Sequence, residues 1–394
     1  MNTSCASKIV AFSQSPFASI PELDLSSIRD WAPVLETLAQ IPGATSICAS
    51  SNGRVRLKML GGYCQPVLRP ELLTDHGWAA LCQILDPGAP DLATEEHGRE
   101  CGREVGSQRF RVARVRYMHG QEFTLRILRS QVPTPEELLL PPQLVKRILE
   151  LPDGLIVFAG RTGHGKTTSI AALAGLCARS NPVPVRVITV EDPVEYLHHD
   201  EPNGSTFTQR EIGSQAKGFA EALRQALRMD PDILVIGEIR DTITAEIALE
   251  ASLTGHKVFT TSHGGNVIEA MQRLHDLTPK VGTLGVGALA QAFRACVAQR
   301  LLRVNAKSAI VPIHEILTSD DSVASKIRGY KFFSLRQDME AGKEAGMQTF
   351  TQAAESRGAQ GLLPRDFCRQ YALYLGGEST FNPASLPGTS TGPA

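Results

Sequence analysis

The sequence has little that marks a secreted, membrane-spanning or nucleic-acid-binding chain. Its 394 residues carry a formal net charge of -1, so bulk electrostatics gives no reason to expect nucleic acid or an anionic membrane as a partner. No apolar run approaches the roughly 18 residues of a membrane span. The first residues lack the basic segment and long apolar run of a signal peptide. We therefore expect a soluble, cytoplasmic protein with no direct nucleic-acid partner.

Cysteine is sparse, and its spacing does not fit a metal site. No two of the eight residues form a C-x-x-C pair, so the sequence predicts no zinc site. Scattered cysteines in a chain of this size are typical of reduced core residues, which favours the cytosol. The eight are Cys5, Cys48, Cys64, Cys82, Cys101, Cys177, Cys296 and Cys368.

The composition is that of a globular protein with more than one domain. Hydrophobic residues make up 42% of the chain and charged residues 21%, as in ordinary folded proteins. A chain of this length exceeds what one compact core usually holds, so two domains are expected.

One motif carries most of the functional information. It fits G-x-x-x-x-G-K-[ST], and it lies between an apolar run typical of a buried strand and a segment with helical spacing. That order of strand, glycine-rich loop and helix is the context of a phosphate site. The motif and the residue after it read Gly160-Arg161-Thr162-Gly163-His164-Gly165-Lys166-Thr167-Thr168.

The chemistry expected at this loop is nucleotide binding. Backbone N–H groups at a helix N-terminus face the phosphates and carry partial positive charge. Lys166 would reach the β- and γ-phosphates, and the Thr167 hydroxyl would ligate Mg²⁺. We expect ATP and Mg²⁺ as the ligands. The alternative is a glycine-rich turn that matches the pattern by chance.

From residue 154 onward, apolar runs alternate with helical patterns. This alternation predicts an α/β fold, with a parallel sheet covered by helices on both faces. After about residue 305 the pattern becomes mostly helical. The predicted strands are Leu155–Ala159, Val185–Val190, Ile233–Ile236 and Lys257–Thr261.

Two of these strands end in acids. Glu238 follows Ile233–Ile236, and in P-loop enzymes the strand beside the P-loop delivers a carboxylate to the Mg²⁺ shell. Glu191 ends the strand before Asp192-Pro193, where it could orient or deprotonate the attacking water. The alternative for Glu238 is a loop acid of the kind common in α/β proteins, and for Glu191 a turn or a helix cap.

Two histidines bracket a further strand. His256 precedes the run 257–261 and His263 follows it. A hydrogen bond from such a histidine to a γ-phosphate or a catalytic carboxylate would couple nucleotide state to a neighbouring element. A single histidine is more often structural, and that alternative stays open.

Together these segments resemble the secretion ATPases of type II secretion, type IV pilus and type IV secretion systems. Residues Gly160–Thr167 resemble the Walker A box, and Glu191–Tyr196 resemble the Asp box. Gly237–Asp241 resembles the Walker B box, which in this family ends in Glu, and Thr254–His263 resembles the His box. The four-Cys zinc element of many type II assembly ATPases has no counterpart. The resemblance is therefore closest to pilus retraction (PilT-like) and Dot/Icm- or I-type conjugation (DotB/TraJ-like) ATPases.

The resemblance implies an architecture and partners. The fold would be a RecA-like P-loop NTPase core with a smaller N-terminal α+β PAS-like domain and a helical C-terminal region. The chain would act as a homohexamer at the inner membrane, with the platform or coupling components of its machine as partners. Arginines of the N-terminal domain would close over the phosphates, and Arg111 and Arg126 match them best. A solvated hairpin face is the alternative for both.

Prolines 133, 135, 141 and 142 mark the domain boundary. Closure around this segment would convert hydrolysis into motion. The expected organisation is an N-terminal PAS-like domain over 1–130, a linker over 131–142, an ATPase core over 143–305, a C-terminal helical region over 306–379 and a disordered tail over 380–394.

Two other functions remain open at this stage. A nucleic-acid translocase on a related ring core would need a basic, aromatic pore lining, which near-neutral charge and 6% aromatic residues do not favour. A nucleotide-binding scaffold without turnover would need only the P-loop. The choice between Glu191 and Glu238 as catalytic base is also open.

Overall fold

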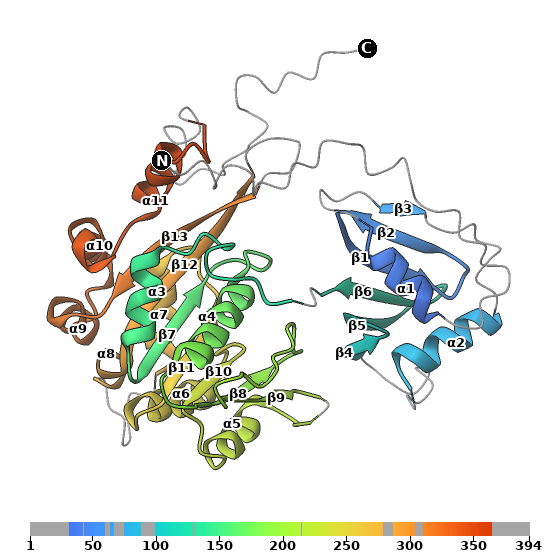
Figure 1. Ribbon diagram of the computed structural model, residues 1–394, viewed down its shortest axis with the longest axis horizontal. Coiled ribbons are helices and arrows are strands. Elements are labelled where there is room, and N and C mark those ends of the chain that lie inside the picture. Colours follow the sequence, from blue (N-terminus) through green and yellow to red (C-terminus); the bar gives the residue numbers. More distant parts are fainter. Residues whose placement is uncertain are drawn as a thin grey trace.

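The computed structural model describes residues 31–41, 43–59, 64–66, 75–87, 99–128, 131–213, 215–278, 287–303 and 310–364. The expected disordered tail, 380–394, and the polar first thirty residues lie outside these ranges. Two sheets organise the described chain, and Figure 1 shows them in separate parts of the molecule. No helix in the described ranges is long and apolar enough to cross a membrane.

The first sheet is small and antiparallel. Its strand order is β3-β2-β1-β6-β5-β4. Two helices share one core with its inner face, because apolar side chains alternate along the strands, as Phe110 and Val112 do on β5. The elements are α1 (Ala32–Ala39), β1 (Ala44–Ser50), β2 (Val55–Met59), β3 (Cys64–Pro66), α2 (Asp75–Leu85), β4 (Arg99–Val105), β5 (Gln108–Tyr117) and β6 (Gly120–Ile127).

The second sheet carries the predicted nucleotide motif. Its order is β13-β12-β7-β11-β10-β8-β9, and every pair is parallel except β12 with β13. Its strands are β7 (Gly154–Ala159), β8 (Arg186–Glu191), β9 (Thr206–Glu211), β10 (Ile233–Ile236), β11 (Lys257–Ser262), β12 (Phe293–Arg303) and β13 (Ile310–Thr318).

Helices cover both faces of this sheet, as the alternating pattern predicted. One face packs against α3 (Pro142–Glu150) and α4 (Lys166–Ser180). The other face packs against a larger set (Figure 1). Because the central strands are buried on both faces, every residue of β7, β10 and β11 is buried, which explains their continuous apolar runs. The larger set comprises α5 (Phe219–Leu227), α6 (Thr242–Leu253), α7 (Val267–Leu277), α8 (Ala288–Ala292), α9 (Asp321–Arg328), α10 (Leu335–Ala341) and α11 (Phe350–Ala359), with two 3-10 turns, η4 (Phe332–Ser334) and η5 (Lys343–Ala345).

Three strands of the larger sheet were not expected from the sequence. β9 is a polar strand at one edge, so it lacks the apolar run of a buried strand. β12 has arginines and a glutamine among its apolar residues. β13 contains Pro312, which an edge strand tolerates because one side of it needs no hydrogen-bond donor. The expectation of mostly helix after residue 305 is therefore wrong for Ile310–Thr318.

Candidate nucleotide site

The predicted phosphate loop joins β7 to α4. Gly160, Gly163 and Gly165 have φ of +147°, +82° and +78°, values that favour glycine. A Cβ at Gly160 would also lie 2.7 Å from the Gln299 carbonyl oxygen. The backbone thus curls tightly into the start of α4, where free N–H groups and the helix dipole favour an anion. Arg161, Thr162 and Gly163 are exposed.

Lys166 opens α4 and folds back over the loop. Its Nζ donates to the carbonyl oxygens of Gly160, at 2.7 Å, and Arg161, at 3.2 Å. Burial lowers the pKa of Lys166, and the charges of Glu238 and Glu195 oppose that shift. The ammonium therefore interacts with the charges of two acids, one after β10 and one in the loop after β8.

Gln299 on β12 supports the loop from beneath, and sequence reasoning missed it. Its Nε2 donates to the His164 carbonyl oxygen at 2.7 Å, and its Oε1 accepts from the Ser169 hydroxyl at 2.7 Å. The only available sequence signal was a glutamine inside an apolar strand, and this glutamine is 3% exposed. His164 contacts the Gln299 backbone through Nδ1, at 3.3 Å, and its pKa is lowered, mainly by burial.

Glu238 follows β10 and is held by two basic side chains. Its Oε1 lies 3.0 Å from His263 Nε2, and its Oε2 accepts from Arg240 Nε at 2.8 Å. Only 11% of the Glu238 side chain is exposed. The strand-end histidine His263 and the carboxylate of Glu238 thus lie within hydrogen-bond distance of each other.

The strand that delivers Glu238 is not the neighbour of the P-loop strand, which corrects the expectation. β11 lies between β7 and β10. Ser262 pairs with Ala159 at the ends of β11 and β7. The three strands are parallel, so their carboxyl ends lie at the same edge of the sheet. His263, which follows β11, therefore comes between the P-loop, which follows β7, and Glu238, which follows β10.

Glu191 ends β8 at the same edge and is buried, with 8% of its surface exposed. The Thr189 hydroxyl donates to its Oε1 at 2.7 Å, and Gln209 Nε2 lies 3.4 Å from the same oxygen. Burial raises the pKa of Glu191 to about 7, against the effect of these hydrogen bonds. A carboxyl group with that pKa can accept or release a proton near neutrality.

His256 lies at the opposite end of β11, which corrects its assignment as a phosphate contact. Lys257, the next residue, pairs with Gly154 at the start of β7. Six strand residues separate His256 from His263, which is roughly 20 Å of strand. The His256 Nδ1 lies 2.9 Å from the Ala251 carbonyl oxygen, at the end of α6. Within this chain His256 therefore supports a helix end, the structural alternative left open above.

The two predicted arginines face each other across β5 and β6. Arg111 pairs with Arg126 in the strand register, on the face opposite the helices. Arg111 forms an ion pair with Glu100 and lies 4.0 Å from Glu195 of the Asp box. Burial lowers the pKa of Arg111, but these acids raise it more. Arg126 is exposed. A third arginine, Arg109, contacts the larger sheet directly and was not predicted.

The residues expected around Mg²⁺ fit that ion when nucleotide phosphates complete the ligand set. Thr167 follows Lys166 in the first turn of α4, and Glu238 supplies a carboxylate whose charge acts on Lys166. Hard oxygen ligands of this kind are what Mg²⁺ prefers. Thr168 points elsewhere, because its hydroxyl lies 3.0 Å from the Tyr196 hydroxyl. No group of three or more His, Cys, Asp or Glu side chains in the described residues could hold a metal ion unaided.

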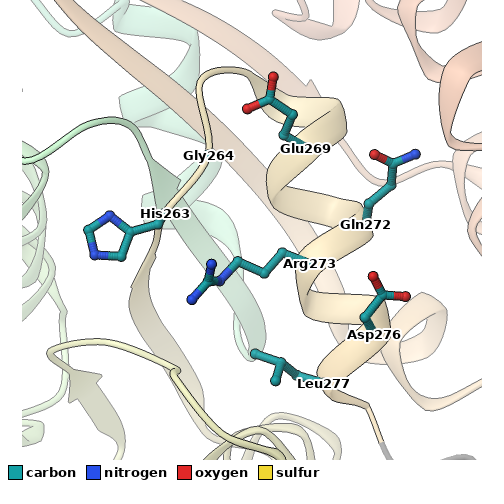
Figure 2. Close-up of a pocket in the computed structure, with 7 residues that line it drawn as sticks. All are labelled: His263, Gly264, Glu269, Gln272, Arg273, Asp276 and Leu277. Atoms are coloured by element: carbon teal, nitrogen blue, oxygen red, sulfur yellow. The ribbon is translucent and has the colours of Figure 1, made fainter.

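A groove of about 670 Å³ flanks the site along α7. Figure 2 shows the Arg273 side chain extending from α7 on the side of His263. The groove is lined by His263, Gly264, Glu269, Gln272, Arg273, Asp276 and Leu277, and none of these belongs to the P-loop. The groove therefore shares His263 with the site and is separate from the phosphate loop in its lining.

Sequence and fold both match known proteins. A family model described as "Type II/IV secretion system protein" matches residues 103–354. The chain is 34% identical over 268 residues to the "Type IV pilus retractation ATPase PilT" of Pseudomonas aeruginosa, which covers 68% of this chain and 76% of the relative. A crystal structure of the pilus retraction motor PilT with bound ADP has a TM-score of 0.74 at 27% identity, over 90% of this chain and 98% of that one. The Legionella pneumophila ATPase DotB shares the fold, with a TM-score of 0.72 at 23% identity over 88% and 97%. The predicted RecA-like fold is therefore confirmed.

Proposed function

The chain belongs to the Type II/IV secretion system protein family, and we propose on that premise that it is an ATPase that powers a type IV pilus, conjugation or type IV secretion apparatus. The observation that carries the proposal is the convergence of Lys166, Glu238 with His263, and Glu191 at one edge of the sheet. The similarity to PilT, whose structure holds ADP, supports a nucleotide at this edge.

The chain's own residues would bind and orient the nucleotide. The loop amides and the start of α4 hold the phosphates, and Lys166 exchanges its contacts with Gly160 and Arg161 for the β- and γ-phosphates. Thr167 and Glu238 would hold Mg²⁺, which would neutralise charge that develops on the phosphates.

Glu191 is our choice for the residue that positions the attacking water. It is the carboxyl group whose raised pKa places its proton exchange near neutrality, whereas Glu238 is engaged by two basic groups. His263 would then report the state of the phosphate to Glu238. Arg111, and more remotely Arg126, would close over the nucleotide from the smaller sheet.

The proposed assembly and location are supported by the resemblance to the family. We propose a homohexamer that works in the cytoplasm at the inner membrane, on a platform or coupling component of its machine. Mass measurement by light scattering with and without ATP tests the first point, and a mass other than six chains under both conditions contradicts it.

The rate of ATP hydrolysis by the wild-type protein and two variants tests the proposed ATPase activity. Lys166→Ala removes the phosphate-binding ammonium, and Glu238→Gln removes a carboxylate while preserving size. We expect kcat to fall by about 100-fold or more in each, the range of losses when a positioned charge is removed. Adding EDTA should abolish turnover by the wild-type protein.

Equal and negligible turnover in the wild-type protein and both variants would contradict the proposed ATPase activity. Strong stimulation of the wild-type rate by DNA would favour the translocase instead. Deleting the gene and scoring piliation, DNA transfer and protein secretion identifies the machine.

A further inference from the structure

Glu211 joins the two sheets through three donors. It ends β9, with 6% of its side chain exposed. Its Oε1 accepts from the backbone N–H of Gly102 on β4, at 3.0 Å. Its Oε2 accepts from Arg109 on β5, at 3.0 Å, and from the backbone N–H of Val194 in the Asp box, at 3.2 Å. One carboxylate thus ties two strands of the small sheet to the Asp box.

Arg109 completes the contact from the other side. While its Nη2 binds Glu211, its Nε donates to the Val194 carbonyl oxygen at 3.1 Å. Its side chain is 15% exposed. Gly102 allows this close approach, because a Cβ there would lie only 2.5 Å from Glu211 Oε2. We call Gly102, Arg109, Val194 and Glu211 the interdomain latch.

The latch lies beside groups that the proposed reaction uses. Glu211 is paired with Glu191 in the register of β8 and β9. Arg109 and Arg111 are two residues apart on β5, so they project from the same face, and Arg111 reaches Glu195. A contact at Arg109 therefore fixes both the loop after Glu191 and the approach of Arg111.

We propose that the Arg109–Glu211 latch holds the small sheet on the Asp box, and that Arg109 and Glu211 are positioning residues for the closed site. The inference rests on the proposed ATPase function, because it concerns how that site closes. Removing either partner leaves a largely buried charge without its nearest opposite charge, since the other acid beside Arg109, Glu104, is 4.0 Å away and exposed. That favours separation of the two surfaces so that water can hydrate the charge. The P-loop itself lies outside the latch.

Backbone amide hydrogen exchange, measured without nucleotide, reports whether the latch is closed. The Gly102 N–H donates to Glu211 across the two sheets, whereas the Val194 N–H donates to Glu211 within the part that carries the larger sheet, so exchange at Gly102 reports the contact. Arg109→Gln, Glu211→Gln and Gly102→Ala should each speed exchange in the peptide that contains Gly102 by about tenfold or more, the change expected when a charged hydrogen bond is lost. Gly102→Ala acts by size alone, so it opens the latch without changing a charge. Arg116→Gln, at an exposed site on the same strand, is the matched control and should leave exchange unchanged.

Kinetics separates positioning from simple loss of structure. We expect kcat to fall by about tenfold or more in each latch variant, with the dissociation constant for ADP within about twofold of wild type, because the phosphate loop is intact. The double variant with Arg109→Gln and Glu211→Gln should be no slower than the worse single variant, since both changes open one contact.

Two results would overturn the latch. One is wild-type exchange at Gly102 in all three latch variants. The other is faster exchange with an unchanged kcat, which would make the contact structural only. If wild-type protein shows no turnover, the ATPase proposal fails while the exchange data still decide whether the contact joins the two surfaces.

Discussion

At the scale of single residues, Glu191 links burial to pH. Burial raises its pKa from 4.5 to about 7. Because the folded protein favours the protonated form, Glu191's contribution to stability is present below pH 4.5 and is lost as the pH rises through about 7. A shift of this size corresponds to about 3 kcal/mol.

Replacement of Glu191 by Gln should remove this pH dependence. The neutral amide preserves the side-chain volume and can still accept from Thr189. We expect the Tm of Glu191→Gln, relative to wild type, to be higher at pH 8 than at pH 5, because the cost of burying a charge is absent. Thermal unfolding at both pH values measures the effect, and Glu150→Gln, at an exposed residue of α3, serves as the control. Equal Tm differences at both pH values would contradict the raised pKa.

At the scale of elements, the acids after β10 have separate tasks. Glu238 faces His263 and Arg240, whereas Asp241 caps α6. The Asp241 side chain accepts from the backbone N–H of Thr244 at 2.8 Å and from its hydroxyl at 2.9 Å. A sequence motif that contains both acids cannot separate a helix cap from a metal ligand.

Asp241→Ala should therefore lower stability without stopping catalysis. Loss of an N-cap typically costs about 1 kcal/mol, and kcat should stay within about twofold of wild type because no other role of Asp241 is expected at the phosphates. Asp241→Asn, which can still accept a hydrogen bond, should recover most of the stability. Thermal unfolding and ATP hydrolysis check both points. A loss of kcat as deep as that of Glu238→Gln would show that Asp241 acts in the site.

At the scale of the whole molecule, part of the expected linker is packed on the core. Leu140 is buried, and its N–H donates to the Pro135 carbonyl oxygen. Arg357 of α11 donates to the Leu139 carbonyl oxygen, and the Arg357 Nε lies 3.4 Å from the Pro312 carbonyl oxygen. We therefore propose that closure bends the chain before residue 134 rather than throughout 131–142.

Arg357→Ala should release this segment. A hydrogen bond from a charged donor contributes about 1.5–3 kcal/mol, so amide exchange in residues 134–140 should rise by roughly ten- to a hundredfold. Arg336→Ala is the control, because Arg336 is exposed and forms an ion pair with Glu340 on its own helix. Exchange measured by mass spectrometry gives the answer. Unchanged exchange at 134–140 would mean that the segment is held by its turns and apolar packing alone.

The sequence alone was enough for the parts of the site that are contiguous in the chain. The P-loop, the acids at 191 and 238, and the alternation of strands and helices were readable because local patterns encode burial and turn geometry. Polar or edge strands carry no such pattern, so β9, β12 and β13 were missed, and with them the support that Gln299 gives to the loop.

Tertiary structure decided which of these residues meet. His256 and His263 bracket one strand, and the sequence does not say which of them lies near the P-loop. The register of β11 with β7 shows that His263 lies at the same end of the strands as the P-loop and His256 at the opposite end. Likewise, the sequence does not distinguish the roles of three arginines on one hairpin, Arg109, Arg111 and Arg126. The contact between the two sheets does so, because Glu211 accepts a hydrogen bond from Arg109. Strand order and contact between sheets depend on residues far apart in the chain, which no local pattern specifies.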